Sequence, residues 1–379
     1  MVLESNFTKR GGGGAESQLR TIARELVRMG QRVAVVTPML ADGPQIAAER
    51  CYGLPVGRVS YPRWRFFGAG IMCLRFAAFL WENRDRYDAW HVHIGHNLGA
   101  ITCLVGDLLG KPVVLKISGW WELERGLLAP RRGPFGLLAR RWLKRAGTVQ
   151  AISTRIAAEL ERHGFPSERI LVLPNAVDTS RFGVQAKRRA PGAPFVAVFV
   201  GRLVEEKGLA TLLDAWAEAF RGRADVRLEL VGGGPLEQPL RRQAEGLGIT
   251  NQVVFLGHQD RVEDVLAKAH LGVLTSRIEG LSNTLLEFMA CGLPSVSSRV
   301  SGSEDFVKPG RNGWLFDVSD TAALAACLRE AEALPGERLA DMGKQARADV
   351  EAAAALPLIV GNLLKLYRGA HPRDLEGAG

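Results

Sequence analysis

Short runs of apolar, β-branched residues alternate along the chain with longer amphipathic stretches. In the first half, the runs at 32–37, 88–93, 112–118 and 148–153 have the length of buried strands. Between them lie stretches with apolar residues at helical spacing, such as 15–29. Strands covered on both faces are almost continuously apolar, and their alternation with helices is typical of parallel sheets. The first half therefore predicts a doubly wound α/β domain.

The second half of the chain repeats this pattern. Its predicted strands are 195–201, 226–232, 252–257 and 271–276, and its predicted helices are 209–220, 236–247 and 282–291. Since 379 residues are too many for one ordinary core, we expect an α/β protein with two doubly wound, Rossmann-like domains facing a cleft. Ligands of such sheets bind beyond the carboxyl ends of the strands.

The boundary between the two predicted domains lies in a polar segment. Residues 181–194 are rich in Pro, Gly and charge, as linkers are. We therefore expect an N-terminal domain at 1–180 and a C-terminal domain at 195–355.

Charge is distributed unevenly over the two halves. Residues 1–180 hold 25 Lys and Arg against 15 Asp and Glu, whereas residues 181–379 hold 24 against 25. Such a basic half can serve an anionic membrane surface, a nucleic acid or solubility alone. No nucleic-acid-binding motif accompanies the charge, so we expect no nucleic-acid partner.

The most basic segment, 131–147, interleaves apolar and cationic residues at helical spacing. Its apolar members include Leu137, Leu138 and Trp142, and its cations include Arg140, Arg141, Lys144 and Arg145. This pattern fits a helix at an anionic membrane surface. It fits equally an ordinary surface helix that packs its apolar stripe inward, and the sequence does not decide between the two.

Cysteine spacing and hydropathy indicate in which cellular compartment the protein is expected. The five cysteines have no short paired spacing, which predicts neither a disulfide framework nor a metal site. The apolar run 66–81 is interrupted by Arg75 and is shorter than the roughly 18 residues of a spanning helix. We expect a cytoplasmic protein, whose association with the inner face of the cytoplasmic membrane depends on 131–147.

The stretch 277–294, "RIEGLSNTLLEFMACGLP", places two glutamates at a turn and in the helix that follows. Ser282 or Asn283 is suited to cap this helix, and the unpaired amides at its start form an anion site. Carboxylates such as those of Glu279 and Glu287 accept hydrogen bonds from vicinal hydroxyls. An anion and two hydroxyl-bearing groups describe a sugar nucleotide, although the spacing alone also fits two unrelated surface acids.

Two other strand ends carry matching chemistry. In "FVGRLVEEKGLATLLDAW" (199–216), Arg202 and Lys207 lie five residues apart on one loop, where two cations suit a diphosphate. In "LVGGGPL" (230–236), Gly232 and Gly234 let the backbone approach a ligand.

Together with "NAVD" (175–178), these segments resemble the retaining glycosyltransferases of the GT-B fold, family 4. In that family the motif is a glutamate, seven residues and a second glutamate, matched by Glu279 and Glu287, and the basic pair is matched by Arg202 and Lys207. The resemblance covers most of 1–370. It implies that 356–369 is a last helix that crosses back to the N-terminal domain.

The resemblance also implies roles for these residues. The substrate is a nucleotide diphosphate sugar, with a UDP-sugar favoured, and no metal or other cofactor is needed. Arg202 and Lys207 stabilise the departing diphosphate, Glu279 binds the donor sugar and Glu287 the ribose hydroxyls. Further donor-binding residues are Gly280, Leu281, Ser282, Asn283, Thr284, Gly232, Gly234 and, near the base, His258.

In the first domain, the resemblance assigns acceptor and cleft-loop residues. Gly13, Gly14 and Glu16 match the family's glycine-rich loop, and His93, His96 and Ser118 lie at strand ends on the acceptor side, with a structural role for either histidine equally open. Many family members have a histidine where this chain has Ser118, which leaves the sugar preference open. The first strand is reduced to "VLES" (2–5), so either the strand is short or the start is late.

The expected acceptor is a glycan or lipid-linked molecule of cell-surface polysaccharide biosynthesis. The basic first domain and the aromatic residues of 64–67 and 120–121 favour this, although those aromatics fit a core equally well. No carboxylate or cysteine pattern accompanies His91, His93 and His96, so no metal is expected there. Two alternatives remain: a sugar-nucleotide epimerase or hydrolase of related fold, and an inactive binding module.

Overall fold

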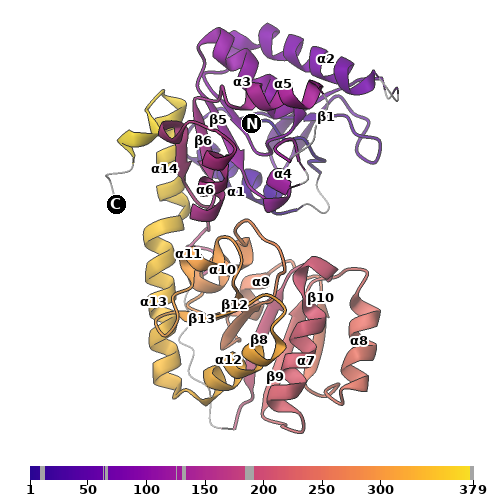
Figure 1. Ribbon diagram of the computed structural model, residues 1–379, viewed down its shortest axis with the longest axis vertical. Coiled ribbons are helices and arrows are strands. Elements are labelled where there is room, and N and C mark those ends of the chain that lie inside the picture. The colour runs from indigo at the N-terminus through magenta and orange to yellow at the C-terminus, as the bar shows by residue number, and fades with distance from the viewer. Residues whose placement is uncertain are drawn as a thin grey trace. The chain divides into compact units, whose positions relative to one another are not determined.

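The computed structural model describes residues 1–8, 13–62, 64, 67–124, 126–129, 134–183 and 192–375. The chain forms two compact units, shown in Figure 1. Unit 1 consists of Met1–Ala176 and Leu356–Gly379, and unit 2 of Val177–Ala355. Residues 184–191, most of the predicted linker, lie outside the described residues.

Unit 1 contains two groups of strands. The first has the order β1 (Val35–Pro38), β3 (Leu54–Val59), β2 (Ala48–Cys51), and the second the order β4 (Trp90–Val92), β5 (Val113–Ile117), β6 (Thr148–Ala151), β7 (Ile170–Val172). All these pairs are parallel except β2 with β3. The four strands expected in this half are present, and from the expected "VLES" strand Val2 forms single bridges to Val36 and Val92.

Helices cover these strands. Their bounds are α1 (Gly14–Arg28), α2 (Gly68–Glu82), α3 (Asn97–Leu109), α4 (Trp120–Glu124), α5 (Pro134–Leu143), α6 (Thr154–Arg162) and α14 (Leu356–Tyr367). Helix α1 buries Leu19, Ile22 and Leu26, which recur at helical spacing. Ile22 and Leu26 share a core with Ile359 and Leu363 of α14, so the last helix completes unit 1.

Unit 2 is one parallel sheet of six strands. The order is β10 (Val253–Gly257), β9 (Val226–Val231), β8 (Phe195–Val200), β11 (Leu271–Leu274), β12 (Ser295–Ser298), β13 (Gly313–Phe316). Its helices are α7 (Leu209–Phe220), α8 (Glu237–Gly246), α9 (Val262–Leu266), α10 (Asn283–Ala290), α11 (Ser303–Phe306), α12 (Thr321–Ala333) and α13 (Gly336–Ala354). Strand order reverses between β8 and β11, and ligands of doubly wound sheets bind at such a reversal.

Trp216 of α7 anchors the core of unit 2. Its side chain is fully buried, and its ring meets Phe220 edge to face with centroids 4.8 Å apart. The indole N–H donates to Gln252 Oε1 at 3.0 Å, so the one polar atom of the ring is satisfied. This packing holds α7, and with it the loop that carries Arg202 and Lys207, against the sheet.

Candidate active site

Lys207 and Glu279 meet at the carboxyl edge of the unit 2 sheet. Lys207 ends the turn after β8, Glu279 lies in the turn after β11, and the Lys207 ammonium forms an ion pair with Glu279 Oε1. Ser276 Oγ donates to the same oxygen at 3.3 Å. Both charged side chains are about one-fifth exposed, at 22% and 19%, so a ligand can reach them while the protein screens them from bulk water.

Arg202 lies on the same loop as Lys207 and is exposed. Its guanidinium forms no ion pair or hydrogen bond with any residue that the structure describes. Lys207 is already neutralised by a carboxylate, whereas Arg202 carries an uncompensated charge. The loop thus offers one preorganised cation and one free cation, which is the arrangement expected for a diphosphate.

Glycines bring the loops of this edge into direct contact. A Cβ at Gly208, which has φ +64°, would lie 2.1 Å from the carbonyl oxygen of Thr275. A Cβ at Gly234 would lie 2.4 Å from the carbonyl oxygen of Leu203. Gly232 has φ +128°, and its Cβ would lie 1.9 Å from the carbonyl oxygen of Gly201. The glycines predicted to admit a ligand therefore also admit neighbouring backbone.

We expect Gly232→Ala to destabilise unit 2 strongly, by more than about 2 kcal/mol, because the new methyl group meets backbone and φ is unfavourable for alanine. The neighbouring Gly233→Ala is the matched control, since a Cβ at Gly233 meets nothing within 4 Å. Denaturant unfolding of both variants measures the difference. Similar midpoints for the two variants would show that the loop adapts to a side chain.

Helix α10 begins at Asn283, four positions after Glu279. Ser282 is its N-cap residue, and Gly280, Leu281 and Ser282 are buried while Asn283 and Thr284 are half-buried. Thr284 Oγ1 donates to the carbonyl oxygen of Val200 at 3.3 Å, which ties the first turn of α10 to the end of β8. The amides at the start of α10 thus lie at the reversal point of the sheet, where a helix N-terminus favours an anion.

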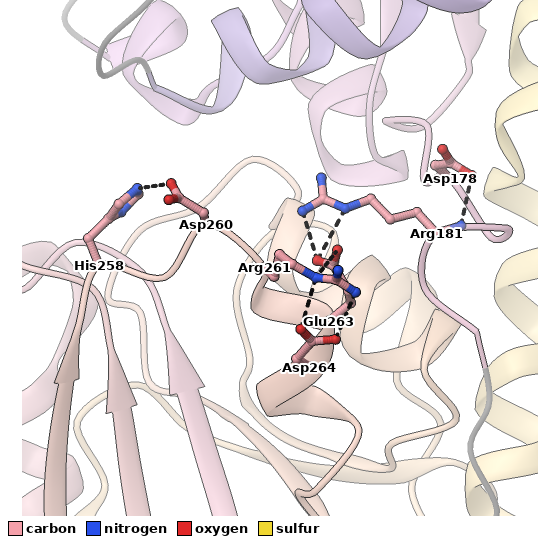
Figure 2. Close-up of polar contacts among 7 residues, drawn as sticks. All are labelled: Asp178, Arg181, His258, Asp260, Arg261, Glu263 and Asp264. Atoms are coloured by element: carbon pink, nitrogen blue, oxygen red, sulfur yellow. Dashed lines mark hydrogen bonds and ion pairs between the residues drawn. The ribbon is translucent and has the colours of Figure 1, made fainter.

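Glu287 lies one turn further along α10 and is half-buried. Burial raises the pKa of its carboxyl to about 7; the positive charge of Arg181 opposes this shift and the negative charge of Glu263 adds to it. Arg181 is held in place by Glu263, whose Oε2 accepts from Nη2 of Arg181 at 2.8 Å (Figure 2). Glu287 therefore changes charge near neutral pH.

His258 follows β10 and is 85% exposed, with Nε2 3.6 Å from Asp260 Oδ1 (Figure 2). Nothing covers this ring in unit 2 as described, so it is available to a ligand. Its predicted place near a nucleotide base stays a prediction.

The residues predicted for the cleft loop, Gly13, Gly14 and Glu16, form the start of α1 and cap it. Gly13 is the N-cap residue, Gly14 begins α1, and Glu16 Oε2 accepts from the Gly13 N–H at 2.7 Å. Ser5 Oγ donates to Glu16 Oε1. In this conformation Glu16 caps the helix, and its place over a ligand stays a prediction. Gly11 and Gly12 of the glycine-rich stretch lie outside the described residues.

The two predicted acceptor histidines differ in exposure. His93 has no exposed surface and stacks on the buried ring of His91 at 4.2 Å, and His91 Nδ1 lies 2.6 Å from the Tyr367 hydroxyl of α14. Strand alternation turns His93 to the same covered face as His91, in line with the structural role that the sequence left open, and its contact with an acceptor stays a prediction. His96 is half-buried, and its Nδ1 lies 2.6 Å from Glu4 Oε1.

Two carboxylates that the sequence analysis missed organise the ends of β4 and β5. Glu122 is buried, and its Oε2 accepts from the N–H groups of Ser118 and Gly119 at 2.7 and 2.8 Å and from Ser118 Oγ at 3.1 Å. Its Oε1 accepts from the Gly95 N–H at 2.6 Å. Glu4 accepts from the Leu98 N–H at 2.6 Å, at the start of α3. Neither carboxylate belongs to a spacing motif, so only the fold reveals it.

Among the residues that the structure describes, no group of three His, Cys, Asp or Glu side chains is placed to hold a metal ion.

Two family models match adjacent parts of the chain. The model described as Glycosyltransferase Family 4 matches residues 12–181, and the model described as Glycosyl transferases group 1 matches residues 182–349. The second match contains the site residues from Arg202 to Glu287. The chain belongs to the group 1, family 4 glycosyltransferases. Together the two matches span residues 12–349.

Several relatives are similar in sequence to part of this chain. The lipopolysaccharide core biosynthesis glycosyltransferase LpsE of Rhizobium meliloti (strain 1021) is 34% identical over 194 residues, which are 50% of this chain and 56% of the relative. The lipopolysaccharide 1,6-galactosyltransferase of Escherichia coli (strain K12) is 29% identical over 187 residues, 48% and 51% of the two chains. The chain thus spans about half the length of these relatives. The N-acetyl-alpha-D-glucosaminyl L-malate synthase of Bacillus anthracis is 29% identical over 301 residues, 78% of each.

Solved structures share the fold. A crystal structure of Anabaena HepE in complex with UDP has a TM-score of 0.78 at 21% identity and covers 97% of this chain and 99% of that one. Sucrose-phosphate synthase from Thermosynechococcus elongatus has a TM-score of 0.75 at 22% identity, with 97% and 98% covered. These likenesses identify the fold as GT-B.

Proposed function

We propose that this protein is a retaining glycosyltransferase that moves a sugar from a nucleotide diphosphate sugar to a glycan or lipid-linked acceptor in cell-surface polysaccharide biosynthesis. The observation that carries the proposal is the meeting of Lys207 and Glu279 beside the exposed Arg202, at the start of α10. Retention of configuration is proposed from the family resemblance.

The chemistry follows from where charge develops. When the bond between the sugar and the diphosphate breaks, negative charge grows on the leaving diphosphate. Lys207 and Arg202 stabilise that charge, and the amides at the start of α10 add oriented dipoles. Glu279 is held by Lys207 and Ser276, so its second oxygen can accept a hydrogen bond from a sugar hydroxyl. Glu287 accepts bonds from the ribose hydroxyls.

The names of relatives support the substrate class. LpsE and the 1,6-galactosyltransferase are both named for lipopolysaccharide, and HepE was crystallised with UDP. A UDP-sugar donor and a surface-glycan acceptor are therefore the proposed substrates. Calorimetric titration with UDP and GDP tests the donor base, with tighter binding of UDP expected.

A product assay separates this function from its alternatives. A glycosyltransferase releases UDP from the donor in proportion to added acceptor and joins the sugar to it. An epimerase converts the donor without any acceptor, a hydrolase releases free sugar, and an inactive module binds without turnover. Any of these last three outcomes would contradict the proposal.

Helix α5 offers a surface for a lipid-linked acceptor. Leu137 and Leu138 are exposed to 60% and 44%, beside the exposed Arg141, while Ala139 and Leu143 are buried. The helix thus presents apolar residues outward as well as inward. Helix α2 adds Leu74 and Trp81, exposed to 72% and 51%, and both helices pack on α3. Residues 131–133 lie outside the described residues.

The cations of α5 and of the residues directly after it divide into two groups. Arg140 donates to the carbonyl oxygen of Ala129 at 2.5 Å, and Arg145 pairs with Asp107 at 2.8 Å, so both hold the unit together. Arg141 is exposed. Each cation close to an anionic lipid surface contributes about 1 kcal/mol, and exposed leucines add apolar burial. No helix in the described part of the chain is long and apolar enough to cross a bilayer.

We expect the protein to float with vesicles of anionic lipid and to be released by 1 M salt, because the Debye length falls from about 10 Å at 0.1 M to about 3 Å. The triple variant Leu137→Ser, Leu138→Ser, Arg141→Gln should lose at least about tenfold in vesicle binding. Val27→Ser, at an exposed apolar site of α1, is the matched control. Equal flotation of the triple variant would remove α5 from the proposal.

A further inference from the structure

The segment 178–182, near the start of unit 2, is tied to the end of α10. Arg347 of α13 fixes it there, because its Nη2 donates to the carbonyl oxygen of Thr179 at 2.9 Å and its Nη1 to that of Phe182. The same Nη1 donates to the carbonyl oxygen of Ala290, the last residue of α10, where a cation also opposes the negative end of the helix dipole. One guanidinium thus joins this segment to the helix that carries the second glutamate of the candidate site.

The side chain of Arg181 is fixed as well (Figure 2). Its guanidinium packs over the ring of the buried Phe182, with 5.0 Å between Cζ and the ring centroid. Its Nε and Nη2 both donate to Oε2 of Glu263 on α9, at 3.2 and 2.8 Å. Arg261 lies further from that carboxylate, since its Nε is 3.9 Å from Glu263 Oε1 but 2.8 Å from Asp264 Oδ2. The charge of Arg181 is therefore compensated by Glu263 before any ligand binds.

Glu287 has no such partner. Among the residues that the structure describes, its carboxylate forms no hydrogen bond or ion pair. The charges of Arg181 and Glu263 nevertheless both act on its pKa, whereas Arg347, at the end of the same helix, is paired with Glu351 at 2.6 Å. A half-buried carboxylate near a guanidinium ordinarily pairs with it. Here the nearby guanidinium is turned to another carboxylate, which leaves Glu287 open to a ligand that carries hydroxyl groups.

We propose that Glu263 is a positioning residue of the donor site, which holds Arg181 away from Glu287 so that Glu287 stays free to accept hydrogen bonds from a ribose. The inference rests on the proposed function, because it takes Glu287 as the acceptor for the ribose hydroxyls. If Arg181 paired with Glu287, only the fraction of molecules in which that pair is broken could bind a nucleotide, and the affinity would fall by that fraction.

Calorimetric titration with UDP tests the inference. Glu263→Gln should bind UDP at least about tenfold more weakly than the wild type at pH 8.5, because the released Arg181 then pairs with the ionised Glu287. Asp264→Asn is the matched control, since Asp264 is the next residue of α9 and pairs with Arg261 instead. This control should bind UDP as the wild type does.

The double variant Arg181→Gln, Glu263→Gln separates this role from a purely structural one. With no guanidinium left to compete, its affinity for UDP should return to within about threefold of the wild type. If Glu263 only held the segment in place, the double variant would bind as weakly as Glu263→Gln or more weakly, and the inference would be wrong. It would also be wrong if Arg181→Gln alone and the double variant were both weak, because Arg181 would then bind the nucleotide itself.

A titration of the unbound protein gives a second measurement. The pKa of Glu287, followed by carbon NMR of its carboxyl group and assigned with Glu287→Gln, should fall in Glu263→Gln, because a negative charge is lost and a guanidinium approaches. In Arg181→Gln the same pKa should rise, because the opposing positive charge is lost. Two shifts in the same direction, or none, would contradict the inference.

Failure of this inference differs from failure of the proposed function. If Glu287→Gln binds UDP as tightly as the wild type at pH 8.5, Glu287 does not bind the ribose and the proposed donor site is wrong. If Glu287→Gln binds weakly while Glu263→Gln binds like the wild type, the donor site stands and only the role of Glu263 is wrong.

Discussion

Replacing Lys207 with alanine should lower kcat of sugar transfer by about 100- to 1,000-fold, which is the usual cost of removing one group that stabilises developing charge. Lys207 is held by Glu279 before any substrate binds, so its side chain does not have to reorient when the diphosphate departs. Initial rates with saturating donor measure the effect. Arg202→Ala should also lower kcat, and its stability should stay close to wild type because the Arg202 side chain has no partner among the described residues.

Two controls make this result specific. Lys344→Ala removes an exposed lysine of α13, 73% exposed, and should leave kcat unchanged. Lys207→Arg keeps a cation, so it should retain more activity than Lys207→Ala. If Lys207→Ala loses activity only in proportion to its loss of folded protein, the lysine is a structural partner of Glu279 and the proposed role is wrong.

Replacing Glu287 with glutamine should weaken nucleotide binding by about 10- to 100-fold at pH 8, because a charge-assisted hydrogen bond contributes about 1.5 to 3 kcal/mol and each 1.4 kcal/mol is tenfold. The loss should shrink as pH falls. The folded carboxyl has a pKa of about 7, so below that pH the wild type is itself protonated and loses its advantage over the amide. Binding that needs the carboxylate therefore strengthens as pH rises from about 5.5 to 8.

Titration of UDP at pH 5.5, 7 and 8.5 into both proteins measures this dependence. The ratio of the two dissociation constants removes the protonation of the diphosphate itself, which affects both proteins alike. The ratio should approach one at pH 5.5 and reach its full value at 8.5. A ratio that does not vary with pH would contradict the role of Glu287 as an ionised acceptor.

Most of the strands could be predicted from apolar runs. Those at β5 and β8 are buried on both faces, and their sequences are accordingly almost continuously apolar. Strands β12 and β13 were not predicted. The first reads "SVSS" and its serines are buried, with Ser298 Oγ donating to the carbonyl oxygen of Ser276 at 2.6 Å. A strand whose polar side chains are satisfied by loops far along the chain carries no apolar signal of its own.

The candidate site likewise has features that spacing predicts and features that depend on contacts between remote segments. The short-range features, namely two glutamates eight positions apart and two cations on one loop, could be predicted from spacing. The ion pair of Lys207 with Glu279 joins residues 72 positions apart. The charges of Arg181 and Glu263, from two other segments, act on the pKa of Glu287. The contact of His91 with Tyr367 likewise joins β4 to α14, which comes from the other end of the chain.

The sequence by itself determined the α/β class, the register of apolar positions in most strands and the residue types of the candidate site. These follow from the local periodicity of apolar residues and from the chemical groups that the side chains carry, and both can be read over a few residues. Tertiary structure alone decided which charges are paired and which carboxyl titrates near neutral pH. Those properties depend on burial and on distances between remote segments, and these exist only after the sheets are assembled.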